Sequence, residues 1–123
     1  MDAPNVIFLD IDGTILYQPL DFTHVVLGND IPELPNSAKK CLDWHKKGYI
    51  IILVTGRPET LRQITEKSLS DKGIIYDRLI MGIGPGKRYL INDRDPLYPD
   101  CDKAIAINIE RNTGIAGINI LWS

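Results

Sequence analysis

The sequence predicts an α/β fold, a single-domain, three-layer Rossmann-like fold with a mainly parallel sheet and no cap domain. Uninterrupted apolar runs of strand length, such as residues 6–9 and 49–54, are typical of strands buried inside a parallel sheet. Segments with helical spacing of apolar residues alternate with these runs, which favours a sheet with helices on both faces. The 123 residues are enough for one domain and one core.

Composition and charge narrow the class of protein. Hydrophobic residues make up 44% of the chain and charged residues 24%, as in ordinary globular proteins. The net charge of −2 gives no basic surface for nucleic acid or anionic lipid, and no apolar run approaches the ~20 residues that span a bilayer. Cys41 and Cys101 are far apart in the sequence, so we expect reduced thiols in a cytoplasmic protein.

The first half of the chain contains one strand, one irregular segment and one helix. Residues 6–9 form the first expected strand, and residues 15–35 contain three prolines that exclude a long helix, so they should form a flap or loop. Asn36 or Ser37 begins a helix with apolar residues at helical spacing, and Gly48 ends it.

The second half continues the alternation. Residues 49–54 predict a second strand, and Pro58 is the expected first residue of a helix that ends before Gly73. Shorter strands are expected at residues 78–81, 89–91 and 104–107, whereas the pattern of residues 108–123 assigns no element.

Polar residues follow three of the expected strands where each strand ends. Asp10 and Asp12 follow the first, Thr55-Gly56-Arg57 the second, and Asn92-Asp93 the fourth. In open α/β sheets the ligand crevice lies outside the carboxyl ends of the strands. Two carboxylates at that edge either hold a metal or divide the roles of nucleophile and general acid/base.

These strand ends resemble the motifs of the haloacid dehalogenase (HAD) superfamily. Asp10-x-Asp12-Gly13-Thr14 is similar to its first motif, Thr55 to its second, and Asn92-Asp93 to its acidic fourth. The resemblance implies a phosphomonoester hydrolase in which Asp10 attacks phosphorus and Asp12 serves as acid and base. It further implies Mg²⁺, with ligands from Asp10, the backbone carbonyl of Asp12, Asp93 and, through its side-chain carbonyl oxygen, Asn92. Thr55, Gly56 and Arg57 would hold the phosphoryl oxygens.

The basic third motif of the superfamily has four candidates in this chain: Lys87, Arg88, Arg94 and Arg57. Six residues separate Lys87 from Asp93, roughly 20 Å if extended, which would place Lys87 near the opposite end of its strand. The four candidates stay open on the sequence alone.

The short link at residues 82–88 and the short flap leave no room for a lid, so we expect a capless enzyme with an exposed site. The resemblance implies a small phosphorylated metabolite as substrate, a sugar phosphate of polysaccharide or heptose metabolism first, and a possible homo-oligomer. The alternatives are a nucleotide phosphatase and a catalytically weak phosphate-binding or scaffold protein. A receiver-type signalling domain fits less well, because its acceptor aspartate would follow the third strand, which here ends in Met81-Gly82.

Overall fold

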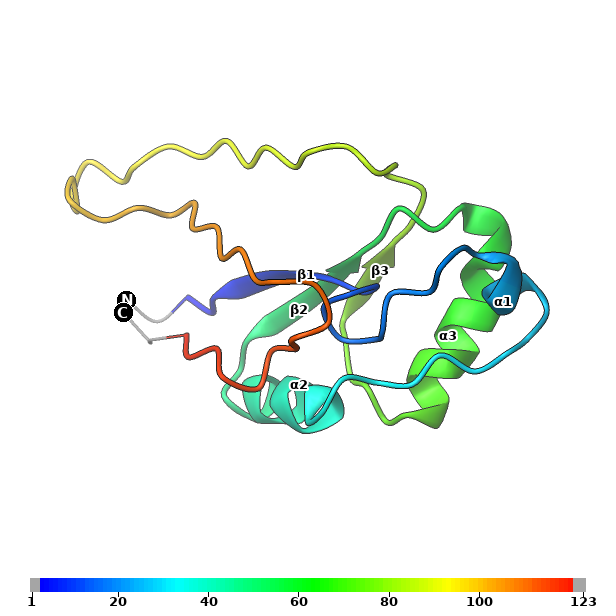
Figure 1. The fold of residues 1–123 in the computed structure, drawn as a ribbon. Helices are drawn as coiled ribbons and strands as arrows, with labels where there is room; N and C mark the ends of the chain where they lie inside the picture. The colour runs from blue at the N-terminus through cyan, green and yellow to red at the C-terminus, as the bar shows by residue number, and fades with distance from the viewer. Residues whose placement is uncertain (1–2, 121–123) are drawn as a thin grey trace.

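A computed structural model describes residues 3–120 and confirms the α/β class, with a three-stranded parallel sheet. The strands are β1 (Val6–Asp10), β2 (Ile50–Val54) and β3 (Arg78–Ile80), in the order β1-β2-β3 (Figure 1). β1 pairs with β2 from Val6 opposite Ile50 to Asp10 opposite Val54, and Val54 pairs with Ile80. The register therefore brings the carboxyl ends of all three strands to one edge of the sheet.

Helices connect the strands as the sequence predicts. α2 (Ser37–Lys46) follows Asn36, which has a left-handed φ of 64°, and the chain turns at Gly48 with φ of 85°. Between β2 and β3, Pro58 precedes a short 3₁₀ helix, η1 (Glu59–Leu61), which leads into α3 (Arg62–Asp71). None of the helices within residues 3–120 has the length and apolar character needed to cross a bilayer.

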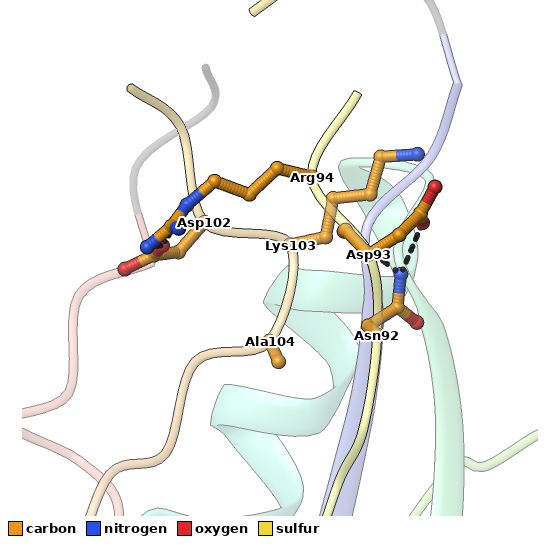
Figure 2. Close-up of a pocket in the computed structure, with 6 residues that line it drawn as sticks. All are labelled: Asn92, Asp93, Arg94, Asp102, Lys103 and Ala104. Carbon is orange, nitrogen blue, oxygen red and sulfur yellow. Dashed lines mark hydrogen bonds and ion pairs between the residues drawn. The ribbon is translucent and has the colours of Figure 1, made fainter. Parts of the chain in front are cut away.

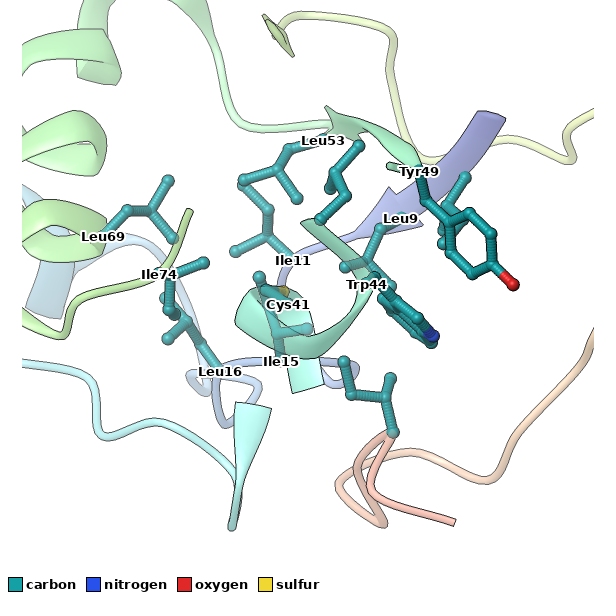
Figure 3. Close-up of a cluster of buried hydrophobic side chains, with 13 residues drawn as sticks. Leu9, Ile11, Ile15, Leu16, Cys41, Trp44, Tyr49, Leu53, Leu69 and Ile74 are labelled. Atoms are coloured by element: carbon teal, nitrogen blue, oxygen red, sulfur yellow. The ribbon is translucent and has the colours of Figure 1, made fainter. Parts of the chain in front are cut away.

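The main core lies between one face of the sheet and both long helices (Figure 3). Ile7 and Leu9 of β1 and Ile51 and Leu53 of β2 point to this face, in the alternation expected of strands. Their partners in the buried cluster come from α2, α3 and the segments around them: Ile11, Ile15, Leu16, Cys41, Trp44, Tyr49, Leu69, Ile74 and Ile115. α2 and α3 therefore share one face of the sheet.

The opposite face of the sheet is more open. On this face Val6 is 45% exposed, Phe8 53% and Ile80 42%. Within residues 3–120 neither long helix covers this face. The strands are therefore packed against α2 and α3 on the other face only.

The flap at residues 15–35 is irregular apart from α1 (Thr23–Val26). It is anchored at both ends, because Ile15, Leu16 and Leu34 are fully buried and the Leu34 N–H donates to the Ile15 carbonyl. A second, smaller cluster joins Val25 of α1 to Leu61 and Met81. The flap thus packs against the same end of the sheet at which the strands end.

The fourth and fifth strands predicted at residues 89–91 and 104–107 are wrong: neither segment forms a strand. β3 is the edge strand farthest from β1, so chain leaving β3 must cross the sheet to reach the free edge of β1. Residues 82–88 are instead tied to the loop after β2, and the chain then runs away from the sheet (Figure 1). Tyr89 and Ile91 are 83% and 92% exposed, so no burial offsets the cost of ordering them as a strand.

The tail, which the sequence pattern leaves unassigned, returns to the body of the protein. Ile115 is fully buried in the main core, and Gly114 passes close to the Leu34 side chain. Lys40 of α2 donates to the Ala116 carbonyl at 3.4 Å. Residues 109–120 therefore form part of the packed structure without forming a helix or strand.

The two cysteine thiols should differ sharply in reactivity. Burial raises the pKa of the Cys41 thiol to about 11, and the nearby Glu33 carboxylate adds to the effect, whereas Cys101 is exposed. Because the thiolate is the reactive form, a thiol reagent at pH 8 should modify Cys101 quickly and Cys41 only after unfolding. A Cys101→Ser variant is the matched control: it should show almost no reaction when folded, and rapid labelling of it would contradict the prediction.

Candidate active site

Two of the predicted site residues lie at the ends of neighbouring strands. Asp10 is the last residue of β1 and pairs with Val54, the last residue of β2, so Thr55 follows at the adjacent position. The Thr14 hydroxyl donates to Asp10 Oδ2 at 3.1 Å. Thr55 is 1% exposed, and its main-chain N–H donates to the Ile80 carbonyl. The parallel register thus brings together the groups that the sequence predicts for one site.

Asp12 forms a paired contact with Arg57. Arg57 Nε donates to Asp12 Oδ2 at 2.9 Å, and Arg57 Nη2 donates to Asp12 Oδ1 at 2.7 Å. The Arg57 side chain is 1% exposed and the Asp12 side chain is 9% exposed. Two parallel hydrogen bonds to a carboxylate fix its orientation as well as its position. The Arg57 guanidinium is therefore bound to Asp12, and this contact competes with its predicted role as a phosphate ligand.

Arg57 is held from three further directions. Its Nη1 donates to the Thr65 hydroxyl of α3 at 3.0 Å, and its main-chain N–H donates to Thr55 Oγ1 at 3.1 Å. The Phe22 ring of the flap lies 5.9 Å from the guanidinium carbon. The sequence did not indicate Thr65 or Phe22 as site residues, because neither belongs to a motif. In the structure Thr65 stands out as a polar residue of a helix that is fully buried.

The turn between Asp10 and Leu16 is compact. The Ile11 carbonyl accepts hydrogen bonds from the N–H groups of residues 14, 15 and 16, and the Gly13 N–H donates to the Leu16 carbonyl at 2.7 Å. Gly13 has a φ of 84°, which favours glycine, and a Cβ there would lie 3.2 Å from Arg111 Cγ. The tail therefore contacts this turn, which the sequence did not indicate.

Asp10 differs from Asp12 in its electrostatics. Burial raises the pKa of the Asp10 carboxyl above its ordinary value of 3.8, and the negative charge of Asp12 raises it further. Hydrogen bonds from the Ile11 N–H and the Thr14 hydroxyl, and the positive charge of Arg88, oppose that increase. Asp10 therefore has no paired cation of the kind that Asp12 has.

The glycine-rich link lies against the loop after β2. The Gly82 N–H donates to the Arg57 carbonyl at 2.8 Å, and a Cβ on Gly56 would lie 2.9 Å from the Gly84 carbonyl oxygen. Arg88 bends back over this link and donates to the carbonyls of Gly84, at 2.8 Å, and Gly86. This arrangement brings the charge of Arg88 close enough to lower the pKa of Asp10; both Arg88 and Lys87 are exposed.

Asn92 and Asp93, which follow the expected fourth strand, do not lie with Asp10 and Asp12. Asn92, Asp93 and Arg94 line a shallow hollow together with Asp102, Lys103 and Ala104, and neither Asp10 nor Asp12 lines it (Figure 2). Arg94 pairs with Asp102 at 2.7 Å across this hollow. Asn92 Nδ2 lies 3.3 Å from Asp93 Oδ1. The structure thus brings together Asp10, Asp12, Thr55, Gly56 and Arg57, and places Asn92, Asp93 and Arg94 in a separate group.

A metal site is not assembled within the described residues. Among residues 3–120 no three histidine, cysteine, aspartate or glutamate side chains are grouped as a metal site would require. Asp10 remains a possible oxygen ligand, since Arg57 occupies Asp12 rather than Asp10. The expected ligands Asp10, the Asp12 main-chain carbonyl and Asp93 are not brought together among the described residues, because Asp93 lies with Asn92 in the separate hollow.

Comparisons with known proteins reveal similarity in structure only. No protein-family model and no curated protein sequence matches the chain. One similar solved chain belongs to the Pnkp1/Rnl/Hen1 complex, with a TM-score of 0.58 and 26% identity over 72% of this chain. A second, from the Pnkp1/Rnl/Hen1 RNA repair complex, has a TM-score of 0.56 and 28% identity over 63% of this chain. The match spans only 31% and 25% of those two solved chains.

A third similar structure, from Vibrio cholerae, matches more of its own length. It has a TM-score of 0.51 and 15% identity, over 80% of this chain and 89% of that one. At that identity the likeness concerns the fold alone. It agrees with the parallel α/β architecture described above.

Arg57→Met should be strongly destabilising, because it removes the cation from a nearly buried Asp12 carboxylate. Breaking a buried ion pair from one side typically costs about 3 kcal/mol or more in the free energy of unfolding. Urea denaturation would measure the loss. Arg78→Met on the exposed side of β3 is the matched control and should stay within about 0.5 kcal/mol; a similar loss in both variants would contradict the prediction.

Asp10→Asn should raise the free energy of unfolding at pH 7. The raised pKa of Asp10 means that the folded state binds its proton more tightly than the unfolded state does, so ionisation opposes folding. The gain should shrink as the pH falls through the folded-state pKa and vanish well below 3.8, where the wild-type carboxyl is protonated in both states. Urea denaturation at several pH values would test this, with Asp100→Asn, an exposed carboxylate, as the control. An Asp10→Asn variant less stable than wild type at pH 7 would contradict it.

Proposed function

We propose that the protein is a small, capless HAD-like phosphatase that hydrolyses a phosphomonoester through Asp10. One observation carries the proposal: Asp10 and Thr55 occupy adjacent strand ends, while the second carboxylate of the motif, Asp12, is fixed by Arg57. Paired carboxylates with different surroundings can take different roles in one reaction. The resemblance of residues 10–14 to the first HAD motif supports the same division.

In the proposed reaction an Asp10 carboxylate oxygen attacks phosphorus, and the bond from phosphorus to the leaving oxygen breaks. The Asp12 carboxyl gives its proton to that leaving oxygen. Asp12 then takes a proton from water, whose oxygen attacks phosphorus and breaks the bond to Asp10, so that inorganic phosphate leaves. Each oxygen of a carboxylate has two lone pairs, so Asp12 can bind a proton while it accepts from Arg57.

The contacts support an assignment of the residues that would surround the phosphoryl group. Arg57 acts through Asp12 as a positioning residue, and its side chain is not available as a phosphate ligand. Arg88 is the basic residue that we assign to the phosphoryl group, because it donates to the Gly84 carbonyl, which lies against Gly56 in the loop after β2. The Gly56 N–H and the Thr55 hydroxyl would complete the set, since oriented donors dominate the catalysis of phosphoryl transfer.

Mg²⁺ is the cofactor that the HAD resemblance implies. It would offset the repulsion between the Asp10 carboxylate and the phosphate anion. Asp10 is the ligand that the described structure leaves accessible, and Asn92 and Asp93 would have to approach it for the expected set to form.

The activity test uses p-nitrophenyl phosphate with and without Mg²⁺. We expect turnover that a chelator removes, that Asp10→Asn abolishes, and that Asp100→Asn leaves at the wild-type rate. Arg88→Gln should lower kcat/KM by tenfold or more, since it removes a cation beside the nucleophile. A larger loss in Lys87→Gln would instead assign the third-motif role to Lys87.

The substrate would be identified by measuring phosphate release from a panel of three classes of phosphomonoester. Sugar phosphates are the first expectation, and nucleotides are the second. RNA with a terminal phosphate is included because two of the similar solved chains belong to the Pnkp1/Rnl/Hen1 complex, described in one case as an RNA repair complex. Failure to hydrolyse any phosphomonoester would overturn the phosphatase proposal and leave a phosphate-binding or scaffold role.

A further inference from the structure

The tail brings one residue, Asn112, directly onto the turn that carries the two aspartates. The Asn112 main-chain N–H donates to the Gly13 carbonyl at 2.8 Å. Its side-chain Oδ1 accepts from the Gln18 N–H at 2.9 Å. A single residue from the far end of the chain thus bonds to the motif turn on one side and to the start of the flap on the other.

Asn112 is held in this position by its own backbone and by the core behind it. Its φ of 65° lies in the left-handed region, which asparagine tolerates better than most residues. Three residues later, Ile115 is fully buried in the main core. The Thr113 hydroxyl donates to the Glu110 carbonyl at 2.7 Å and closes the turn around Asn112. The contact is therefore anchored on both sides of Asn112.

Both groups that Asn112 contacts are connected to the Asp12–Arg57 pair. Gly13 directly follows Asp12, and its N–H is already bonded to the Leu16 carbonyl. With its carbonyl bonded to Asn112, both main-chain polar groups of Gly13 are fixed. Gln18 begins the part of the flap that places the Phe22 ring over the Arg57 guanidinium. Loss of the Asn112 contacts would free the turn and the flap together.

We propose that Asn112 is a positioning residue: it holds the Gly13 turn and the flap so that Asp12 meets Arg57 in its paired geometry. The structural part of this inference stands without any assumed activity, and its effect on catalysis rests on the proposed function. Misplacement of a reacting group by about 1 Å can cost up to 10²-fold in rate. Asn112 would thus act on the rate of the chemical step rather than on substrate binding.

Two substitutions separate the side-chain bond from the backbone. Asn112→Gly keeps the left-handed φ and the N–H bond to Gly13, and removes only the acceptor for Gln18. Asn112→Asp keeps an acceptor oxygen at the same place and should behave like wild type. Asn108→Gly, at an exposed position of the same tail, is the matched control for added backbone freedom.

The first measurement follows the Gln18 amide and the Arg57 Nε–H by NMR hydrogen exchange. In Asn112→Gly we expect both to exchange about fivefold faster or more. The Gln18 amide loses its acceptor, and the Arg57 Nε–H loses the rigid turn that holds Asp12. Asn112→Asp and Asn108→Gly should retain wild-type exchange. An Arg57 Nε–H that stays protected in Asn112→Gly, while Gln18 exchanges faster, would overturn the positioning role.

The second measurement is the kinetics on p-nitrophenyl phosphate. Asn112→Gly should lower kcat by about tenfold with little change in KM, and Asn112→Asp should restore it. A wild-type kcat in Asn112→Gly would overturn the catalytic part of the inference. If the wild-type protein hydrolyses no phosphomonoester, the proposed function fails, and the Arg57 exchange rates still decide whether Asn112 positions the pair.

Discussion

The ion pair between Asp12 and Arg57 is the interaction on which the arrangement of the site depends. A guanidinium that is 1% exposed is costly to bury unless its donors are satisfied, and the protein supplies acceptors from two other segments. Asp12 comes from the turn after β1, Arg57 from the loop after β2, and Thr65 from α3, while Phe22 of the flap covers the guanidinium. Forming this one pair therefore fixes the relative positions of four elements.

The pair also gives the two aspartates different properties. Asp12 is oriented by two charge-assisted hydrogen bonds, whereas Asp10 keeps an accessible carboxylate whose pKa is raised by burial and by the charge of Asp12. The two carboxylates of residues 10–14 therefore have different surroundings, on which the proposed division of roles rests.

The structure is supported unevenly around this site. α2 and α3 pack on one face of the sheet, and the buried tail supports the motif turn from the same side through Ile115. The other face remains about half exposed at Val6 and Phe8, and the chain beyond residues 82–88 runs away from the sheet (Figure 1). Asp10 alternates with Val6 and Phe8 along β1, so the proposed nucleophile lies on the open side, whereas the Asp12–Arg57 pair is nearly buried.

Local patterns in the sequence determined the strands that end at Asp10 and Val54, the two long helices, and the position of Asp10 and Thr55 at strand ends. Those features follow from short-range signals, since apolar runs, helix starts and glycine stops act within a few residues. Tertiary structure alone decided that Arg57 binds Asp12, that Asn112 reaches the Gly13 turn, and that residues 89–91 and 104–107 stay outside the sheet. Each of these depends on where distant segments meet in space. Residue type predicts that Arg57 is a cation and that residues 10–14 form a motif, but the contacts that assign them roles arise only when the chain is packed.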